Sequence, residues 1–372
     1  MKSSELLKVS IDVSSVPMRP AGAGRYAIEL ASGLVERAVN EEIYLVTTRA
    51  SKRYWQDIAP GSHLIPTVPS QRPLRLLYEQ IGMGRDLRRS GIGLHHGIHY
   101  TMPRRFAGPR VVTIHDTTLI EHPEWHERSK VVFFGEAIRA AAKYADALIC
   151  PSHATAARVM ELLEPRADVF VVYHGVDTDW LSVPDVPLPP GVGPRYLLFV
   201  GTLEPRKDLP TLVEAFSQIG REDPDLRLVI AGQVGWMAEE SLAAIQRSRF
   251  SERIVRLDYV DDSTLSTLYR NATAFVYPSL YEGFGLPVIE AMAAGIPVVT
   301  TRDSVMVEVS RGNVVQAEPS DPTSLSQGIR RVLAGGPEIG RKVQLARATA
   351  ASYTWEASVE AHLTIYRNVA SG

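Results

Sequence analysis

The chain has 372 residues, of which 45% are hydrophobic and 22% are charged, and its formal net charge is −2. This composition is ordinary for a globular protein with room for two hydrophobic cores, and the nearly balanced charge supplies no overall field that would attract nucleic acid. The single cysteine, Cys150, excludes an internal disulfide, so the chain is not a small disulfide-bonded secreted protein.

The N-terminal sequence MKSSELLKVSIDV lacks the features of a signal peptide, because Lys8 and Asp12 interrupt its apolar stretch. No run of residues approaches the roughly 20 apolar positions that a membrane-spanning helix needs. We therefore expect a cytoplasmic protein, and peripheral contact with the inner face of the cell membrane stays open.

Short runs rich in valine and isoleucine alternate with helical patterns in the first half of the chain. The strand candidates are residues 8–13, 43–48, 110–114, 147–150 and 169–173. They show little alternation of polar and apolar residues, which is typical of parallel strands buried on both faces. Helical spacing of apolar residues follows the first of them. Repeated strand–helix units of this kind predict a doubly wound α/β sheet.

A proline-rich segment, residues 184–194, separates two such halves. Its sequence, PDVPLPPGVGP, holds five prolines and predicts a semi-rigid linker. We therefore expect a Rossmann-like domain over residues 1–183 and a second one over residues 195–353. Strand candidates in the second half are residues 196–201, 226–232, 253–257, 274–278 and 296–300. A last helix, around residues 354–369, has no strand after it.

The segment YEGFGLPVIEAMAAG, residues 281–295, carries two glutamates at a predicted strand-to-helix corner. Glu282 lies in the loop, and Glu290 lies in the first turns of the helix that Pro287 begins. The backbone N–H groups that approach this helix N-terminus form a candidate anion site; they belong to Gly283, Phe284, Gly285 and Leu286. An anion site flanked by two carboxylates suits a nucleotide sugar, in which a diphosphate separates two sets of hydroxyls.

Other polar residues also follow predicted strands, where ligands of open α/β sheets bind. Arg206 and Lys207 follow residues 196–201 and could neutralise a leaving diphosphate. His115 and Asp116 follow residues 110–114, and His115 could donate to a sugar hydroxyl or take part in proton transfer.

The stretch GAGRYA, residues 22–27, fits the pattern G-x-G-x-x-A and opens a helix, which raises an NADP-dependent oxidoreductase as a rival. About eight residues separate it from the preceding strand, whereas the dinucleotide fingerprint follows its strand directly. The second strand ends without an acid for a ribose, although Arg49 could serve a 2′-phosphate. We favour the interpretation that Gly22 and Gly24 let a loop approach ligand phosphates.

Two further patterns bear on metals and membranes. Asp177 and Asp179 form a D-x-D beside the linker, away from any predicted strand end, so we expect no metal site there. The segment 72–91 mixes leucines with arginines. It is either an ordinary surface helix with an apolar core face or a basic amphipathic helix that lies on anionic lipid.

These motifs support a resemblance. The chain resembles family 4 of the retaining glycosyltransferases, which have the GT-B fold of two Rossmann-like domains facing a central cleft. The matching pieces, in the family's order, are GAGRYAIEL, TIHD, VYHGVD, VGTLEPRKDL, IAGQVGW, YPSLYEGFGLPVIEAMAAGIPVV and SYTWEASVEAHLTIYR. Within the family the chain looks most like bacterial mannosyl- and rhamnosyltransferase-type members that build cell-surface polysaccharides.

The resemblance implies roles for the matching positions. Arg206 and Lys207 would hold the donor diphosphate, and Glu282 would contact hydroxyls of the donor sugar. His115 would lie near the transferred sugar. The remaining donor-binding positions that it implies are Gly22, Gly24, Gly201, Tyr259, Val260, Gly283, Phe284, Gly285, Leu286 and Glu290. The N-terminal domain would bind the acceptor, and the C-terminal domain would bind the nucleotide sugar. The terminal helix, residues 354–372, would pack back on the N-terminal domain.

The sequence departs from the family's pattern at two of these places. His174 stands where asparagine is common, and Asp258 stands where glycine often precedes the base-binding pair. The second departure leaves the identity of the nucleotide base open.

The expected reaction is transfer of a hexose from a nucleoside diphosphate sugar to an acceptor hydroxyl, with retained anomeric configuration and no metal or other cofactor. The family favours GDP-mannose as donor and a glycan or glycolipid as acceptor. A catalytically silent nucleotide-sugar-binding protein and a GT-B nucleotide-sugar epimerase remain alternatives, beside the oxidoreductase.

Overall fold

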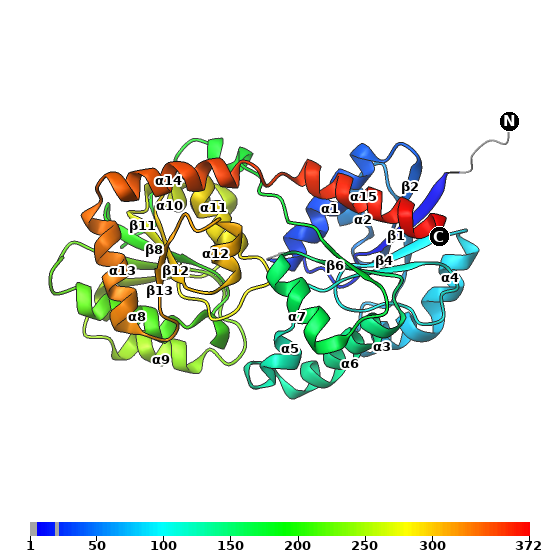
Figure 1. Ribbon diagram of the computed structural model, residues 1–372, viewed down its shortest axis with the longest axis horizontal. Helices are drawn as coiled ribbons and strands as arrows, with labels where there is room; N and C mark the ends of the chain where they lie inside the picture. Colours follow the sequence, from blue (N-terminus) through cyan, green and yellow to red (C-terminus); the bar gives the residue numbers. More distant parts are fainter. Residues whose placement is uncertain (1–5, 19–21) are drawn as a thin grey trace. The chain divides into compact units, whose positions relative to one another are not determined.

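The computed structural model describes residues 6–18 and 22–372 (Figure 1). Residues 1–5, at the start of the expected N-terminal domain, and residues 19–21 lie outside the described part. Contacts divide the chain into two compact units. Unit 1 comprises Met1–Ile120, Ser129–Gly175 and Thr354–Gly372, and unit 2 comprises Glu121–Arg128 and Val176–Tyr353.

Unit 1 is built on a seven-stranded parallel sheet with the strand order β3-β2-β1-β4-β5-β6-β7. The strands are β1 (Leu7–Asp12), β2 (Glu41–Thr48), β3 (His63–Val68), β4 (Leu94–Gly97), β5 (Arg110–Thr113), β6 (Ala147–Cys150) and β7 (Asp168–Val171). The order reverses between β1 and β4, because β2 and β3 extend the sheet to one side of β1 while β4 to β7 extend it to the other. This reversal makes a topological switch point, the usual place for a ligand in an open α/β sheet.

The helices of the first half connect these strands. They are α1 (Ala23–Arg37), α2 (Lys52–Ile58), α3 (Arg72–Tyr78), the π-helical turn η1 (Glu79–Met83), α4 (Gly84–Arg89), α5 (Thr118–Glu121), the 3₁₀ turn η2 (Pro123–Trp125), α6 (Arg128–Tyr144) and α7 (His153–Leu163). On α1, Tyr26, Leu30 and Leu34 are fully buried in the core cluster of the sheet. Helical spacing of its apolar residues therefore predicts α1 correctly.

The terminal helix α15 (Trp355–Ser371) belongs to unit 1 and packs against α1 (Figure 1). Hydrogen bonds between buried side chains also connect it to the unit: the Tyr26 hydroxyl is 3.0 Å from Nε2 of His362, and Nδ1 of His96 is 2.7 Å from the Tyr366 hydroxyl. Buried polar groups are costly unless they are paired, so these contacts fix how α15 lies on its unit.

Unit 2 is built on a six-stranded parallel sheet with the strand order β10-β9-β8-β11-β12-β13. The strands are β8 (Tyr196–Val200), β9 (Arg227–Ala231), β10 (Ile254–Leu257), β11 (Ala274–Tyr277), β12 (Val298–Thr301) and β13 (Val315–Ala317). Its helices are α8 (Leu209–Ile219), α9 (Glu239–Arg247), α10 (Asp262–Asn271), α11 (Leu286–Ala294), α12 (Val305–Val309), α13 (Pro322–Ala334) and α14 (Pro337–Ala350), with the 3₁₀ turns η3 (Asp179–Ser182), η4 (Pro205–Lys207) and η5 (Ser251–Arg253). The switch point of this sheet lies between β8 and β11.

Residues 176–183, which we expected at the end of the first domain, are counted with unit 2. The physical reason is Trp180, a buried side chain whose ring lies 5.6 Å from that of Tyr269 on α10. The proline-rich segment 184–194 follows without helix or strand, and the backbone N–H of Val186 donates to the Thr267 hydroxyl. This segment is therefore held against unit 2.

No helix in residues 6–18 and 22–372 is long and apolar enough to span a bilayer.

Two glycines bring the ends of β8 and β9 close together. Gly201 follows β8 with a φ of 156°, and Gly232 follows β9 with a φ of 154°. A Cβ atom placed on Gly232 would lie 2.0 Å from the carbonyl oxygen of Gly201. No side chain fits in that space, so both the conformation and the contact require glycine at position 232.

We therefore expect Gly232→Ala to lower the free energy of unfolding of unit 2 by roughly 2–4 kcal/mol, because it adds backbone strain to a steric clash. Thermal and urea unfolding followed by circular dichroism would measure the loss. The matched control is Gly340→Ala on α14, where nothing lies within 4 Å of an added Cβ and alanine favours the helix. Equal stability of the two variants would contradict the close approach.

Candidate active site

The switch point of unit 2 brings together the residues that follow β8 and β11. After β8 the chain runs through Gly201 to the short turn η4, which carries Arg206 and Lys207. After β11 it runs from Tyr277 to Glu282. Since β8 and β11 are adjacent parallel strands, both loops emerge at the same edge of the sheet.

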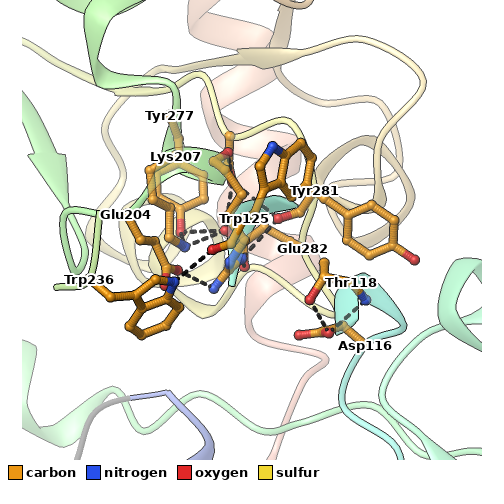
Figure 2. A network of polar contacts seen from close by, with 11 residues as sticks. Asp116, Thr118, Trp125, Glu204, Lys207, Trp236, Tyr277, Tyr281 and Glu282 are labelled. Carbon is orange, nitrogen blue, oxygen red and sulfur yellow. Dashed lines mark hydrogen bonds and ion pairs between the residues drawn. The ribbon is translucent and has the colours of Figure 1, made fainter. Parts of the chain in front are cut away.

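Glu282 is at the centre of the resulting polar cluster (Figure 2). Its Oε1 atom accepts hydrogen bonds from the Tyr277 hydroxyl at 2.9 Å and from the Ser279 hydroxyl at 2.8 Å, and it pairs with the Lys207 ammonium. Its Oε2 atom pairs with Nη1 of Arg206 at 2.7 Å. A carboxylate accepts about four hydrogen bonds, so these four donors use most of the capacity of Glu282.

Glu204 completes the cluster and was not predicted from the sequence. Its Oε1 atom lies 2.6 Å from Nη2 of Arg206, and its side chain is 3% exposed. Arg206 is therefore paired with two carboxylates, Glu204 and Glu282. The geometry fixes the direction of the guanidinium, which also donates to the carbonyl oxygen of Tyr281 at 2.8 Å.

The charges of this cluster are stabilised by one another. Burial acts to raise the pKa of Glu282, but the neighbouring Arg206 and Lys207 outweigh it and hold that pKa at about 2. Burial and the charge of Arg206 lower the pKa of Lys207, while Glu282 and Glu204 oppose the change. Glu282 is consequently ionised at neutral pH, and its ion pair with Lys207 lies in a site with little access to water, where electrostatic interactions are strong.

The helix α11 begins directly beyond this cluster. Gly285 precedes it with a φ of 90°, a conformation that favours glycine, and Pro287 occupies its first turn. These features place the positive end of the helix dipole after the loop of Gly283 and Phe284. Glu290, one turn further on, accepts a hydrogen bond from the Tyr269 hydroxyl at 2.9 Å.

The other predicted positions in unit 2, Gly201, Tyr259 and Val260, lie around the cluster or further along the same sheet. A Cβ on Gly201 would lie 3.8 Å from Cε of Lys207, so this glycine borders the lysine side chain. Tyr259 and Val260 follow β10, which is separated from β8 by β9. Tyr259 is half exposed.

The remaining predicted residues belong to unit 1. His115 follows β5, is buried, and its Nε2 atom lies 2.8 Å from the carbonyl oxygen of Ile98. Since a carbonyl can only accept, Nε2 carries the proton, and burial lowers the pKa of this histidine. His115 is thus a neutral imidazole whose Nδ1 atom is an acceptor. Gly22 precedes α1 with a φ of 48°, and Gly24 is buried in the first turn of α1.

The D-x-D pattern has a local role. The Asp177 carboxylate accepts a hydrogen bond from the backbone N–H of Asp179 at 2.8 Å, which closes a turn before η3. Among the residues that the structure describes, no group of three or more His, Cys, Asp or Glu side chains is arranged to hold a metal ion.

Comparison with known proteins agrees with this architecture. The family described as "Glycosyltransferase Family 4" matches residues 20–180, and the family "Glycosyl transferases group 1" matches residues 187–348. The O-antigen chain mannosyltransferase B of Escherichia coli is 26% identical over 382 residues, which cover 97% of this chain and 100% of that protein.

Solved structures give the same fold. Sucrose-phosphate synthase from Thermosynechococcus elongatus superposes with a TM-score of 0.78 at 19% identity, covering 98% of this chain and 99% of the other. Anabaena HepE in complex with UDP-glucose superposes with a TM-score of 0.73 at 16% identity, covering 97% and 100%.

Two Rossmann-like units with parallel sheets define the GT-B class of proteins, as the sequence predicts. The chain belongs to glycosyltransferase family 4, with the two family descriptions matched in order along it. The resemblance drawn from its motifs is confirmed, and the chain is a glycosyltransferase.

Proposed function

We propose that the protein transfers a hexose from a nucleoside diphosphate sugar to an acceptor hydroxyl, with retained anomeric configuration, in the synthesis of a polysaccharide, glycan or glycolipid. The observation that carries the proposal is the arrangement of Arg206 and Lys207 at the switch point of unit 2, held by Glu204 and Glu282. Two cations fixed in this way suit a diphosphate that gains charge as the bond to the sugar breaks.

In the proposed mechanism Glu282 orients other groups and does not attack the sugar. Its oxygens accept from Lys207, Arg206, Tyr277 and Ser279, so a free lone pair aimed at an anomeric carbon is not expected. The acceptor hydroxyl then attacks from the face that the diphosphate leaves, and the leaving phosphate takes the proton of the acceptor. Retention follows without a covalent glycosyl-enzyme intermediate.

The other predicted positions have supporting roles in this proposal. The N-terminus of α11, with residues 283–286, faces the donor, and Glu290 binds the ribose. His115 accepts a hydrogen bond from a hydroxyl of the transferred sugar through Nδ1. Tyr259 and Val260 border the base, and Gly22, Gly24 and Gly201 let backbone approach the phosphates. Arg206 and Lys207 contact the leaving diphosphate directly in this proposal, so the reaction needs no metal ion.

We propose GDP-mannose as the donor. The support is the similarity along nearly the whole chain to a mannosyltransferase of Escherichia coli. UDP-sugars are the competing class, because Anabaena HepE binds UDP-glucose in the same fold.

A thermal-shift panel of nucleotide sugars tests the proposal. A ligand at 100 times its dissociation constant adds about 2.7 kcal/mol to stability, so the true donor should raise the unfolding temperature clearly. We expect GDP-mannose to do so in the wild-type protein and to lose the effect in Lys207→Ala. If NADPH raises the unfolding temperature and no nucleotide sugar does, the oxidoreductase is favoured instead.

Product analysis separates the remaining alternatives. A transferase hydrolyses its donor slowly without an acceptor and releases the nucleoside diphosphate. An epimerase converts the donor sugar and releases none, while a silent binding protein leaves the donor intact.

We also propose peripheral contact with anionic membranes through the helical segment 72–89. Three of its apolar side chains, Leu74, Leu77 and Ile81, are exposed, so an apolar core face does not account for them. The same segment carries the arginines Arg72, Arg75, Arg85, Arg88 and Arg89. Apolar side chains next to cations suit the headgroup region of an anionic bilayer.

We expect co-sedimentation with liposomes to increase with the fraction of anionic lipid and to fall in the double variant Leu77→Ser/Ile81→Ser. Since both side chains are half exposed, the variant should unfold at the wild-type temperature. The control is Met160→Ser on α7, another exposed apolar residue. Co-sedimentation that does not change with the fraction of anionic lipid would contradict the membrane contact.

A further inference from the structure

Unit 1 contains a pocket of about 400 Å³ at its own switch point. The pocket is lined by the segment that follows β1, residues 14–17, and by residues 97–99, which comprise the last residue of β4 and the two after it. The first turn of α1, the helical segment 72–79 and α6 contribute the other walls. All of these lining residues belong to unit 1.

Two carboxyl side chains face this pocket, and no step proposed above uses them. Asp12 ends β1 and accepts a hydrogen bond from the backbone N–H of Ser14 at 2.9 Å. Glu79 is 4% exposed and accepts from Nε2 of Gln80 at 3.2 Å. Each carboxyl lies in the electrostatic field of the other, which is unfavourable for both when they are ionised.

The position of Glu79 depends on a π-helical turn. The turn η1 joins α3 to α4. Leu77 near the end of α3 and Ile81 within the turn are each 55% exposed, while Glu79 is buried. Such turns are rare and frequently occur at functional sites. A chain that buries an acid here loses stability by doing so, which indicates that the acid serves a ligand.

Burial and the charge of Asp12 raise the pKa of Glu79 to about 8. At neutral pH the Glu79 carboxyl is therefore mostly protonated and can both donate and accept a hydrogen bond. Sugar hydroxyls offer the same pair of capacities. Asp12 and Glu79 together suit adjacent hydroxyls of a saccharide.

Three cationic side chains, Arg72, Arg75 and Lys130, also line this pocket and make it positively charged. Nη1 of Arg75 donates to the carbonyl oxygen of Ser14 at 3.1 Å, and the guanidinium of Arg72 lies 5.9 Å from the ring centre of Phe134. Lys130 on α6 is the third cation. Three positive side chains outnumber the two carboxyl groups, so the pocket lining has an excess of positive charge, which favours an anionic group on the ligand.

We propose that this pocket binds a saccharide that carries a phosphate or carboxylate, with Asp12 and Glu79 contacting hydroxyls and with Arg72 and Lys130 contacting the anion. This proposal rests on the proposed function in one respect: the bound saccharide is taken to be the acceptor of the transferred hexose. The presence of the site itself depends only on unit 1.

Calorimetric titration and saturation-transfer NMR with four probes test the proposal: glucose 6-phosphate, glucuronate, glucose and inorganic phosphate. We expect at least one of the two anionic sugars to bind at least tenfold more tightly than glucose and than inorganic phosphate. Comparison of the two anionic sugars distinguishes a phosphate from a carboxylate as the preferred group.

Variants locate the binding. Arg72→Ala and Glu79→Met, which removes the donor and the acceptor of the side chain, should each weaken the preferred probe at least tenfold, while Lys143→Ala, an exposed cation elsewhere on α6, should leave it unchanged. Glu79→Gln keeps the shape and supplies both a donor and an acceptor, so it should bind the preferred probe nearly as the wild-type protein does, and thermal unfolding shows whether Glu79→Met is folded. Unchanged affinity in Arg72→Ala and Glu79→Met, or no preference for an anionic sugar, would overturn the proposal.

Nucleotide-sugar binding, measured on the same variants, separates this outcome from failure of the proposed function. The donor should stabilise Arg72→Ala and Glu79→Met as it does the wild-type protein, because Arg206 and Lys207, which are proposed to hold its diphosphate, lie in unit 2, and neither Arg72 nor Glu79 is proposed to contact the donor. Loss of donor binding in Lys207→Ala with anionic sugars still bound would confirm two sites. If the donor binds and none of the anionic sugars does, the saccharide site in unit 1 is refuted and the proposed transferase function is not.

Discussion

Lys207→Ala is expected to lower turnover at least about 100-fold, a loss comparable to removal of one donor from an oxyanion hole. Lys207 is 6% exposed at its side chain, and its ammonium contacts both Glu282 and the Tyr277 hydroxyl, the latter at 2.5 Å. Its charge is fixed in a site with little water, where the developing charge of a diphosphate leaving group is strongly stabilised. Turnover of the identified donor with saturating acceptor, or its slow hydrolysis, measures the effect.

The matched control for this prediction is Arg247→Ala, an exposed cation near the end of α9 in the same unit. It should keep wild-type activity. Circular dichroism and thermal unfolding must show that Lys207→Ala is folded. A folded Lys207→Ala protein with near-normal turnover would exclude this lysine from the chemistry.

Glu282→Gln is expected to reduce turnover by a similar factor of at least about 100, although the substitution preserves size and shape. The amide carries no charge, so Arg206 and Lys207 lose the anion that positions them, and the –NH₂ group places a donor against other donors. Glu282→Ala should lose as much activity and more stability. Removal of one partner from a buried ion pair costs about 3–5 kcal/mol.

The acid dependence of stability supplies a second measurement for Glu282. Because its pKa is lowered to about 2 from an ordinary value near 4.5, the ionised group stabilises the fold above pH 4.5. That stabilisation is lost as the pH falls from 4.5 toward 2. The glutamine variant should lack this component of acid unfolding. Glu338→Gln, an exposed carboxylate on α14, is the control and should change little. An identical acid profile in wild type and Glu282→Gln would contradict the ion pairs.

Most of the fold could be predicted, because buried parallel strands have continuous apolar sequences. Residues 110–114 and 147–150 are examples, and they became β5 and β6. The strands β3, β4 and β13 were missed for physical reasons. β3 is an edge strand that contains Pro66, β13 is a three-residue edge strand, and β4 reads LHHG.

β4 shows why polar sequence can occur inside a core. His95 is fully buried, and its Nδ1 atom lies 2.8 Å from the Ser10 hydroxyl on β1. His96 is also buried and lies 2.8 Å from the Thr113 hydroxyl on β5. The partners come from neighbouring strands that are distant in sequence, so no local pattern reveals them.

The candidate site was predictable in outline. Arg206, Lys207 and Glu282 all follow strands, and adjacency of β8 and β11 brings them into contact. Glu204 and Tyr277 gave no signal of their own, because their roles arise only from contacts across those two loops. The one hint was that Glu204 stands two residues before Arg206.

The segment 72–89 contains a feature that the sequence does not predict, the π-helical turn η1. Its leucines and arginines predict an amphipathic helix, and helices α3 and α4 confirm the helical conformation. No local pattern predicts the π-helical turn between them, and Gly84, directly after it, lies so close to Arg105 that an added Cβ would be 2.7 Å from the Arg105 carbonyl oxygen. This turn is what places Glu79 in the pocket of unit 1 and leaves Leu77 exposed.

A crystal structure of the protein with its nucleoside diphosphate donor bound would test the roles of Arg206 and Lys207 in diphosphate binding. We expect both phosphates in unit 2 at the ends of β8 and β11, with phosphate oxygens within about 3 Å of the Arg206 guanidinium and the Lys207 ammonium. A diphosphate bound elsewhere, with these two side chains still paired only to Glu204 and Glu282, would contradict these roles.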